Sequence, residues 1–113
     1  MELWNEIELK RRDLSDAIAV LREYGKKRSV YERDYKIAYR KEIFRLRTED
    51  KIAWTAAVSM AHGDTEYFDV ATKRYNRDLA DSLYQATQEN INGIKLDIRI
   101  LESQLNREWS VSK

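Results

Sequence analysis

The amino-acid sequence predicts an all-α fold, a long antiparallel hairpin in which two long helices are joined by a short helix at the corner. Three observations predict it. The 113 residues include no proline and three glycines, so little in the chain interrupts a helix. Apolar residues recur at spacings of three and four, which is the period of one helix face. No stretch shows the apolar and polar alternation of a strand next to a hairpin turn. We therefore expect one helical domain over residues 1–113.

The first long helix is predicted over residues 3–47. Its apolar stripe begins with Leu3 and Ile7 and continues in aromatic form through Tyr31 and Tyr35 to Leu46. Gly25 lies in the middle of this pattern. A break of the helix at Gly25 is one of two ways to cover the apolar surface discussed below.

The corner is predicted to hold a short apolar helix over residues 52–61. Gly63 follows it, and we expect this glycine to adopt the left-handed conformation that often ends a helix. Asp64 or Thr65 is then the expected N-cap of the next helix, because a short polar side chain can accept a hydrogen bond from a free backbone amide.

The second long helix is predicted over residues 65–109. Near its end the apolar residues step by three, four, three and four, which is the heptad spacing of a coiled coil. They are Ile91, Ile94, Ile98, Leu101 and Leu105. In an antiparallel hairpin this stripe runs beside the stripe at the start of the first helix.

Each long helix carries more apolar surface than one neighbour can cover. On the first helix Val30, Ile37 and Phe44 lie seven residues apart on a second face. Either the first helix breaks near Gly25 and the chain folds into a compact bundle, or two hairpins pair into a four-helix, coiled-coil homodimer. We favour the homodimer, because small residues such as Gly93 allow a crossing helix to approach closely.

The composition excludes several kinds of site. The chain has no cysteine, so it has no disulfide and no thiolate, and its single histidine, His62, cannot form the usual zinc site alone. We find no glycine-rich phosphate loop and no nucleophile elbow. We therefore expect a protein that is not an enzyme, with no cofactor and no metal.

A basic segment over residues 22–47 contains ten lysines and arginines against four acidic residues, in a chain whose net charge is +1. One interpretation is a solvated helix face whose charges pair with acidic residues of the other helix. The alternative is a nucleic-acid contact surface with tyrosines available for base stacking. The candidate contacts are Lys26, Lys27, Arg28, Arg33, Lys36, Arg40, Lys41 and Arg47.

The short corner segment carries Trp54, Val58 and Met60, three large apolar side chains on an element too short to bury them by itself. They either cap the hairpin core or form an exposed hot spot for a protein partner. We treat these three residues as the candidate partner-binding tip.

Several segments of the chain form a recognisable series. They read Glu32-Arg33-Asp34-Tyr35-Lys36-Ile37-Ala38, Lys41-Glu42-Ile43, Arg45-Leu46-Arg47-Thr48-Glu49, Ala61-His62-Gly63-Asp64, Arg77-Asp78-Leu79-Ala80, Ile98-Arg99-Ile100-Leu101-Glu102 and Arg107-Glu108-Trp109. The series resembles small helical proteins of uncharacterised function encoded by phages and prophages of Gram-positive bacteria. In such sequences the corner reads Glu-Gly-x-Pro-Val-Thr, followed later by Ala-Arg-Gly. Here residues 50–55 lack the glycine and the proline, and His62 stands in place of the arginine.

The resemblance implies an accessory phage protein that is not an enzyme and that modulates host or phage DNA metabolism or a host defence system. It provides no catalytic residues to transfer to this chain. We expect a protein of the bacterial cytoplasm, without a membrane segment, that acts through a host or phage protein partner. Nucleic-acid binding by residues 22–47 is the alternative.

Overall fold

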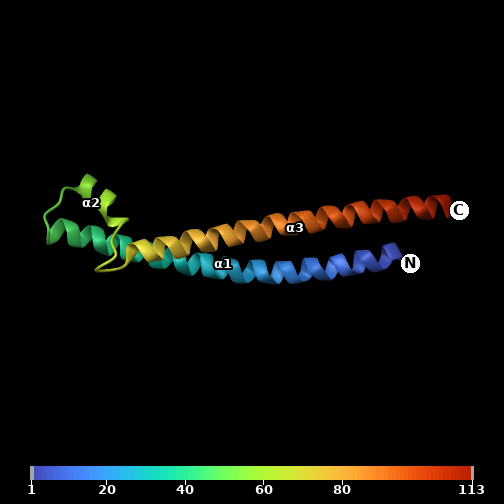
Figure 1. Cartoon of the computed structure of the whole chain (residues 1–113), viewed down its shortest axis with the longest axis horizontal. Coiled ribbons are helices and arrows are strands. Elements are labelled where there is room, and N and C mark those ends of the chain that lie inside the picture. The colour runs from blue at the N-terminus through green and yellow to red at the C-terminus, as the bar shows by residue number, and fades with distance from the viewer. Residues whose placement is uncertain (1, 113) are drawn as a thin grey trace. The chain divides into compact units, whose positions relative to one another are not determined.

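The computed structural model describes residues 2–112, and within them the chain forms three α-helices and no strand. They are α1 (Glu2–Thr48), α2 (Trp54–Ala61) and α3 (Val70–Ser112) (Figure 1). The predicted hairpin of two long helices with a short helix at the corner is confirmed. No helix within the described range is long and apolar enough to span a membrane.

The contacts within the chain define two compact units. The terminal unit consists of Met1–Glu23 and Tyr84–Lys113, and the corner unit consists of Tyr24–Leu83. In the terminal unit, α1 and α3 meet in a core of Ala17, Ile91 and Ile94. The half-buried residues against this core are Leu14, Ile18, Leu21 and Ile98. Except for Ala17, these residues belong to the two stripes that the sequence predicted to run beside each other.

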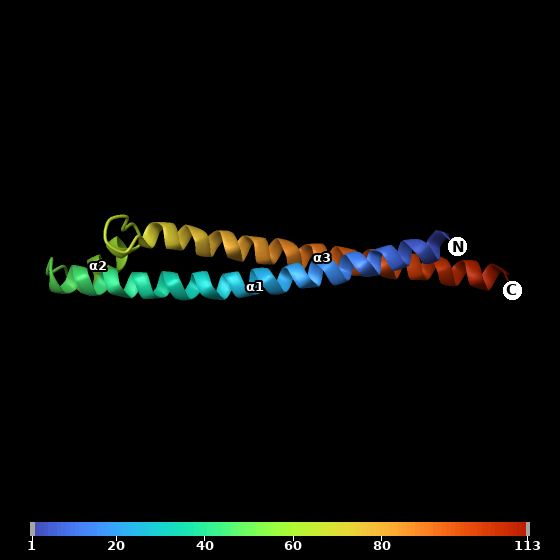
Figure 2. The same cartoon turned by 90° about the horizontal axis from the view of Figure 1, so that it is seen from below.

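The corner unit has two small cores. Tyr35, Ala38 and Val70 form one of them, where α1 meets the start of α3. In the other, α2 packs against the end of α1, beside which it lies in both cartoon views (Figures 1 and 2). Ala57 and Ala61 of α2 are completely buried there against Ile43 and Leu46. Two alanines one turn apart allow α2 to approach α1 closely.

Helix α1 runs without interruption through Gly25, so the alternative of a break at this glycine is wrong. A glycine inside a helix costs about 1 kcal/mol relative to alanine. One isolated cost of this size does not break a helix whose neighbouring turns are held by the contacts of Leu21 and Tyr35. Helix α3 also continues through Gly93.

The prediction that α3 begins at residue 65 is wrong, because the helix begins at Val70. Asp69 has a φ of 52°, which a right-handed helix cannot contain. The carboxylate of Asp64 instead accepts hydrogen bonds from the backbone amides of Glu66, Tyr67 and Phe68, so it stabilises a turn ahead of the helix. Asp64 therefore caps this turn, and its carbonyl also accepts the amide of Ala71 in the first turn of α3 at 2.9 Å, although Asp69 is the residue that directly precedes the helix.

The expected left-handed stop at Gly63 is also wrong, since no glycine among the described residues has a positive φ. Besides Asp69, the corner has a left-handed residue at Lys51, with a φ of 53°. It follows the end of α1, and the amide of Ile52 donates to the carbonyl of Leu46 at 3.0 Å. This bond spans seven residues, one more than the six-residue hydrogen bond of a Schellman motif, and Lys51 holds the left-handed position after the helix that glycine usually occupies. Ile52 is consequently outside α2, which begins at Trp54.

We predict that Lys51→Gly stabilises the protein by about 0.5–1 kcal/mol, because glycine relieves the steric cost of the left-handed conformation. Urea unfolding followed by circular dichroism measures the free energy of unfolding. The control is Lys27→Gly, in the exposed interior of α1, which should destabilise the protein by about 1 kcal/mol. Equal destabilisation by the two substitutions would contradict this description of the end of α1.

Candidate functional site

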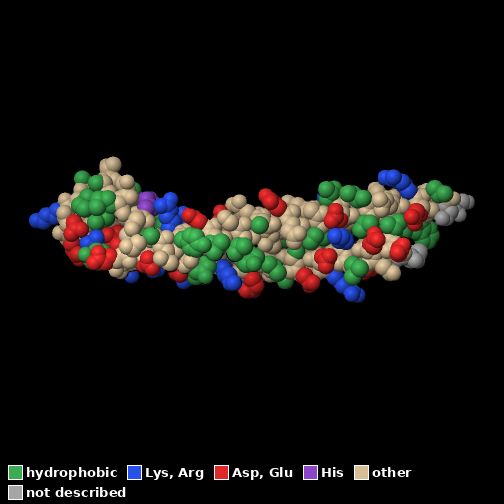
Figure 3. Space-filling view, in the orientation of Figure 1, with side chains coloured by type: hydrophobic (Ala, Val, Ile, Leu, Met, Phe, Trp, Pro, Cys, Tyr) green, Lys and Arg blue, Asp and Glu red, His purple; other side chains and the backbone are tan. Residues whose placement is uncertain are grey.

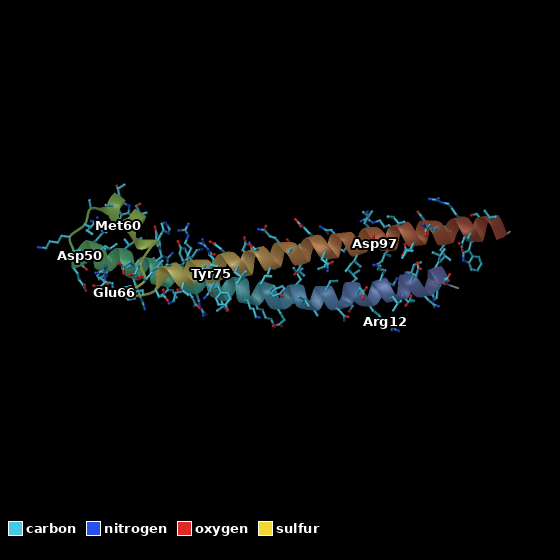
Figure 4. All side chains as sticks on the ribbon, in the orientation of Figure 1. Arg12, Asp50, Met60, Glu66, Tyr75 and Asp97 are labelled. Carbon is cyan, nitrogen blue, oxygen red and sulfur yellow. The ribbon has the colours of Figure 1, made fainter. Side chains whose placement is uncertain are left out.

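The predicted tip residues divide between core and surface. Val58 is half-buried against the core formed by Ile43, Leu46 and the two alanines of α2. Trp54 and Met60 remain 59% and 53% exposed. Hydrophobic side chains gather on the surface over α2 (Figure 3), and Met60 is labelled there in Figure 4. Helix α2 thus caps the core with one face and presents apolar side chains on another.

An aromatic stack holds the end of α2 against α1. The rings of Tyr39 and His62 lie 4.5 Å apart, centroid to centroid, and the Tyr35 hydroxyl lies 2.8 Å from His62 Nδ1. Tyr39 donates its hydroxyl hydrogen to the carbonyl of Val58 at 2.9 Å. The guanidinium of Arg77, from α3, lies 4.1 Å from the centroid of the Tyr35 ring. Through this stack, both α2 and α3 contact α1.

A buried ion pair lies on the adjacent turn of α1. Glu42 is 2% exposed, and its Oε1 lies 2.6 Å from Nη2 of Arg45. Arg45 also binds Asp50 at 3.2 Å, and its guanidinium stacks on the ring of Tyr67 at 3.6 Å. The hydrogen bond that Arg45 donates to Glu42, and the nearby carboxylates, raise the pKa of Arg45 above its already high value. This cluster fixes the turn before α3 against α1, so its charges serve the local structure.

The turn at 64–69 and the facing side of α1 form a groove. Glu66, labelled in Figure 4, lies in this turn. One part of the groove has a volume of about 410 Å³ and the adjoining part about 500 Å³, and both parts share Lys41, Tyr67 and Phe68. Ile37 and Phe44 of α1 also line it and are 45% and 70% exposed. A groove with such exposed apolar walls is a usual feature of a protein-binding surface.

The charges along the groove are unevenly neutralised. Arg45 is held by Glu42 and Asp50, and Asp34 is held by Arg33 at 3.3 Å. Arg40 and Lys41 are exposed, and neither forms an ion pair among residues 2–112. Asp69 and Lys73 lie at one end, where Lys73 donates to the carbonyl of Phe68. The middle of the groove is therefore apolar with two cations beside it, while Asp69 lies at one end and exposed Glu49, 3.9 Å from Arg45, lines the other part.

Intramolecular contacts account for several cations of the predicted nucleic-acid surface. Arg28 binds Asp81 of α3 at 2.8 Å, and Lys36 lies 3.4 Å from Glu32. Arg47 lies over the ring of Trp54 at 5.7 Å. These contacts support the interpretation of a paired, solvated helix face for part of the segment. The nucleic-acid surface itself stays a prediction.

The sequence did not predict the groove, although it did reveal one of the two walls. The spacing of Val30, Ile37 and Phe44 revealed the apolar face of α1. The other wall depends on the turn at 64–69, which was predicted to be helical. The burial of Glu42 had no signal in the sequence, because an acidic residue three positions before an arginine usually lies on a helix surface.

No protein family model, no curated protein and no solved structure matches this chain. The resemblance to phage-encoded proteins therefore stays a prediction. Within residues 2–112, no group of three or more histidine, cysteine, aspartate or glutamate side chains is arranged to hold a metal ion.

We predict that acidification loosens the corner unit through His62. Its partial burial, and then the nearby Arg74 and Arg77, lower its pKa from the ordinary value of 6.5. Below pH 6.5 the unfolded chain therefore binds more protons than the folded chain, and the free energy of unfolding decreases as the pH falls from 6.5 toward the lowered folded pKa. Between about pH 7.5 and about pH 5.5, the melting temperature should fall more for the wild type than for His62→Gln. Equal falls would contradict a structural role for the neutral imidazole.

Proposed function

We propose that this chain acts by binding another protein, and that the groove beside the turn at 64–69 takes an acidic peptide segment with apolar side chains. The observation that supports this proposal is that Ile37 and Phe44 are exposed. They lie on the same stretch of α1 as Arg40 and Lys41. Apolar side chains of the peptide pack against the apolar walls of the groove, and its carboxylates pair with the two cations. An interaction of this kind requires no catalytic group.

Burial of the exposed apolar side chains of the groove against a peptide makes the free energy of binding more favourable. Removing apolar surface from water contributes about 25 cal/mol per Å². Phe44, at 70% exposed, has the largest area to gain among the residues that line the groove. The two cations contribute mainly to the choice of partner and to the association rate, since their pairing with carboxylates is exposed to solvent and is screened by salt.

A host or phage protein is the partner that the phage resemblance implies. Trp54 and Met60 offer a second apolar surface in the same unit, on α2. We place the peptide in the groove because cations and apolar walls meet there.

We predict that a random peptide library panned on the wild-type chain yields peptides rich in aspartate, glutamate and large apolar residues. Binding of a selected, fluorescently labelled peptide is measured by anisotropy. Lys41→Glu and Phe44→Ala should each weaken it by about tenfold or more. The matched control is Lys27→Glu, which makes the same charge change on an exposed residue of α1 outside the groove.

Three results would contradict the groove as the site. One is a library without enrichment, and another is binding that Lys41→Glu and Phe44→Ala leave unchanged. The third is loss of binding in Trp54→Asp with full binding in Lys41→Glu, which would move the site to the tip on α2.

Nucleic-acid binding is the second candidate, and the excess of ten cations over four acidic residues at 22–47 favours it. If this segment binds phosphates, labelled single-stranded or double-stranded DNA should bind with an affinity that decreases steeply with salt. The triple variant Lys26→Ala/Lys27→Ala/Arg28→Ala should then lose most of the binding. We expect the intramolecular pairs to leave DNA binding weak, and absence of binding at about 50 mM salt would remove this candidate.

A further inference from the structure

Helix α3 has a second apolar stripe in addition to the one that contacts α1. Tyr75, Leu79, Leu96 and Ile100 lie on it and are 65%, 46%, 53% and 49% exposed. Tyr75 is labelled on α3 in Figure 4. Between these large residues the same helical register passes through small ones.

The intervening positions continue the heptad spacing without a gap. They are Ser82, Ala86, Glu89 and Gly93, so the steps from Tyr75 to Ile100 are four, three, four, three, four, three and four. All four positions are exposed, and a Cβ atom placed on Gly93 would have nothing within 4 Å. The spacing over more than three heptads is that of a coiled-coil seam, with large apolar residues at its two ends and with Ser82, Glu89 and Gly93 among its central positions.

We propose that two copies of this chain pair through this stripe, with their α3 helices antiparallel and the two-fold axis between Ala86 and Glu89. This inference goes beyond the proposed function and does not depend on it. The occupant is a second copy because a two-fold contact brings the same surface together twice, and the sequence of side-chain sizes on the stripe reads nearly the same in both directions.

The large residues meet one another in this register. Tyr75 lies opposite the partner's Ile100, and Leu79 lies opposite the partner's Leu96. By symmetry the same two layers occur at the other end of the contact. The 26 residues from Tyr75 to Ile100 extend about 39 Å along α3. Both ends of the interface are thus closed by pairs of large apolar side chains.

The small residues meet in the middle of the contact. Ser82 lies opposite the partner's Gly93, and Ala86 lies opposite the aliphatic part of the partner's Glu89. Only the Ser82 and Gly93 layers consist of small residues alone, and each of the two layers between them pairs an alanine with a glutamate. In a parallel, in-register pair each Glu89 would instead face the partner's Glu89, and two like charges would share one layer.

The charges beside the stripe also select the antiparallel register. The flanking position of Asp78 lies opposite that of the partner's Arg99, so by symmetry two carboxylates, each already bound to Arg77 of its own chain at 2.9 Å, come close to a second arginine. The parallel, in-register arrangement places no acidic residue opposite a basic one in this row, so charge complementarity supports the antiparallel pair.

The absence of cysteine from the sequence makes disulfide cross-linking a direct test. Ser82→Cys and Gly93→Cys are made as separate variants, mixed at equal concentration and oxidised with diamide. Opposite positions in one layer bring the Cα atoms within the distance of about 4.4–6.8 Å that a disulfide spans. We expect a covalent dimer from the mixture and little from either variant alone, because the two copies of one position lie about 16 Å apart along the helices.

A second pair of variants tests the interface without cysteine. Ala86→Arg should reduce the mass measured by light scattering from about twice the 13.5 kDa of one chain to 13.5 kDa, with unchanged helicity. The matched control is Gln88→Arg, an exposed residue two positions along α3 and off the stripe, which should remain dimeric.

Several outcomes overturn the proposal. Cross-linking of each single variant with itself means a parallel pair, and a dimeric mass without any cross-link means that another face forms the contact. A wild-type mass of 13.5 kDa at every concentration removes the homodimer altogether. None of these results changes the peptide binding expected of the groove, so the two proposals fail independently.

Discussion

The contact between α1 and α3 is the interaction on which the rest of the structure depends, and it covers only one stripe of each helix. In the terminal unit that contact consists of Ala17 against Ile91 and Ile94, with a few half-buried neighbours. A helix with one neighbour leaves most of its circumference in water. Leu9, Leu96 and Ile100 of the same unit are therefore about half exposed, although each is as apolar as the residues of the core. This limited coverage is the reason for both interactions that we propose.

The corner unit adds the third element that a two-helix hairpin lacks. Completely buried Ala57 and Ala61 bring α2 onto α1, and the stack of Tyr39 and His62 holds it there. Because α3 starts late, at Val70, the turn before it projects beside α1 and forms a wall of the groove. The same features that stabilise the corner thus create the surface with the most suitable chemistry for a partner.

The long-range architecture could be predicted from the sequence because heptad spacing reports directly on helix faces. The stripe at Ile91, Ile94 and Ile98 meets α1 as expected. The corner could not be predicted, because its conformation depends on single hydrogen bonds. Three amides bound by Asp64 outweigh the helical spacing of the residues that follow, and a lysine occupies the left-handed position expected of glycine. The end of the short helix at Ala61 was predicted correctly and its start was predicted two residues too early, but the groove required the true course of residues 64–69.

Hydroxyl-radical footprinting of the wild-type chain at low and high concentration tests most directly whether the second apolar face is covered by association. Mass spectrometry then measures oxidation at individual side chains. We predict that Leu96 and Ile100 are oxidised in dilute solution and protected in concentrated solution, whereas Ile91 and Ile94, which are nearly buried within the chain, are protected in both. Oxidation of Leu96 and Ile100 that does not depend on concentration would contradict the account.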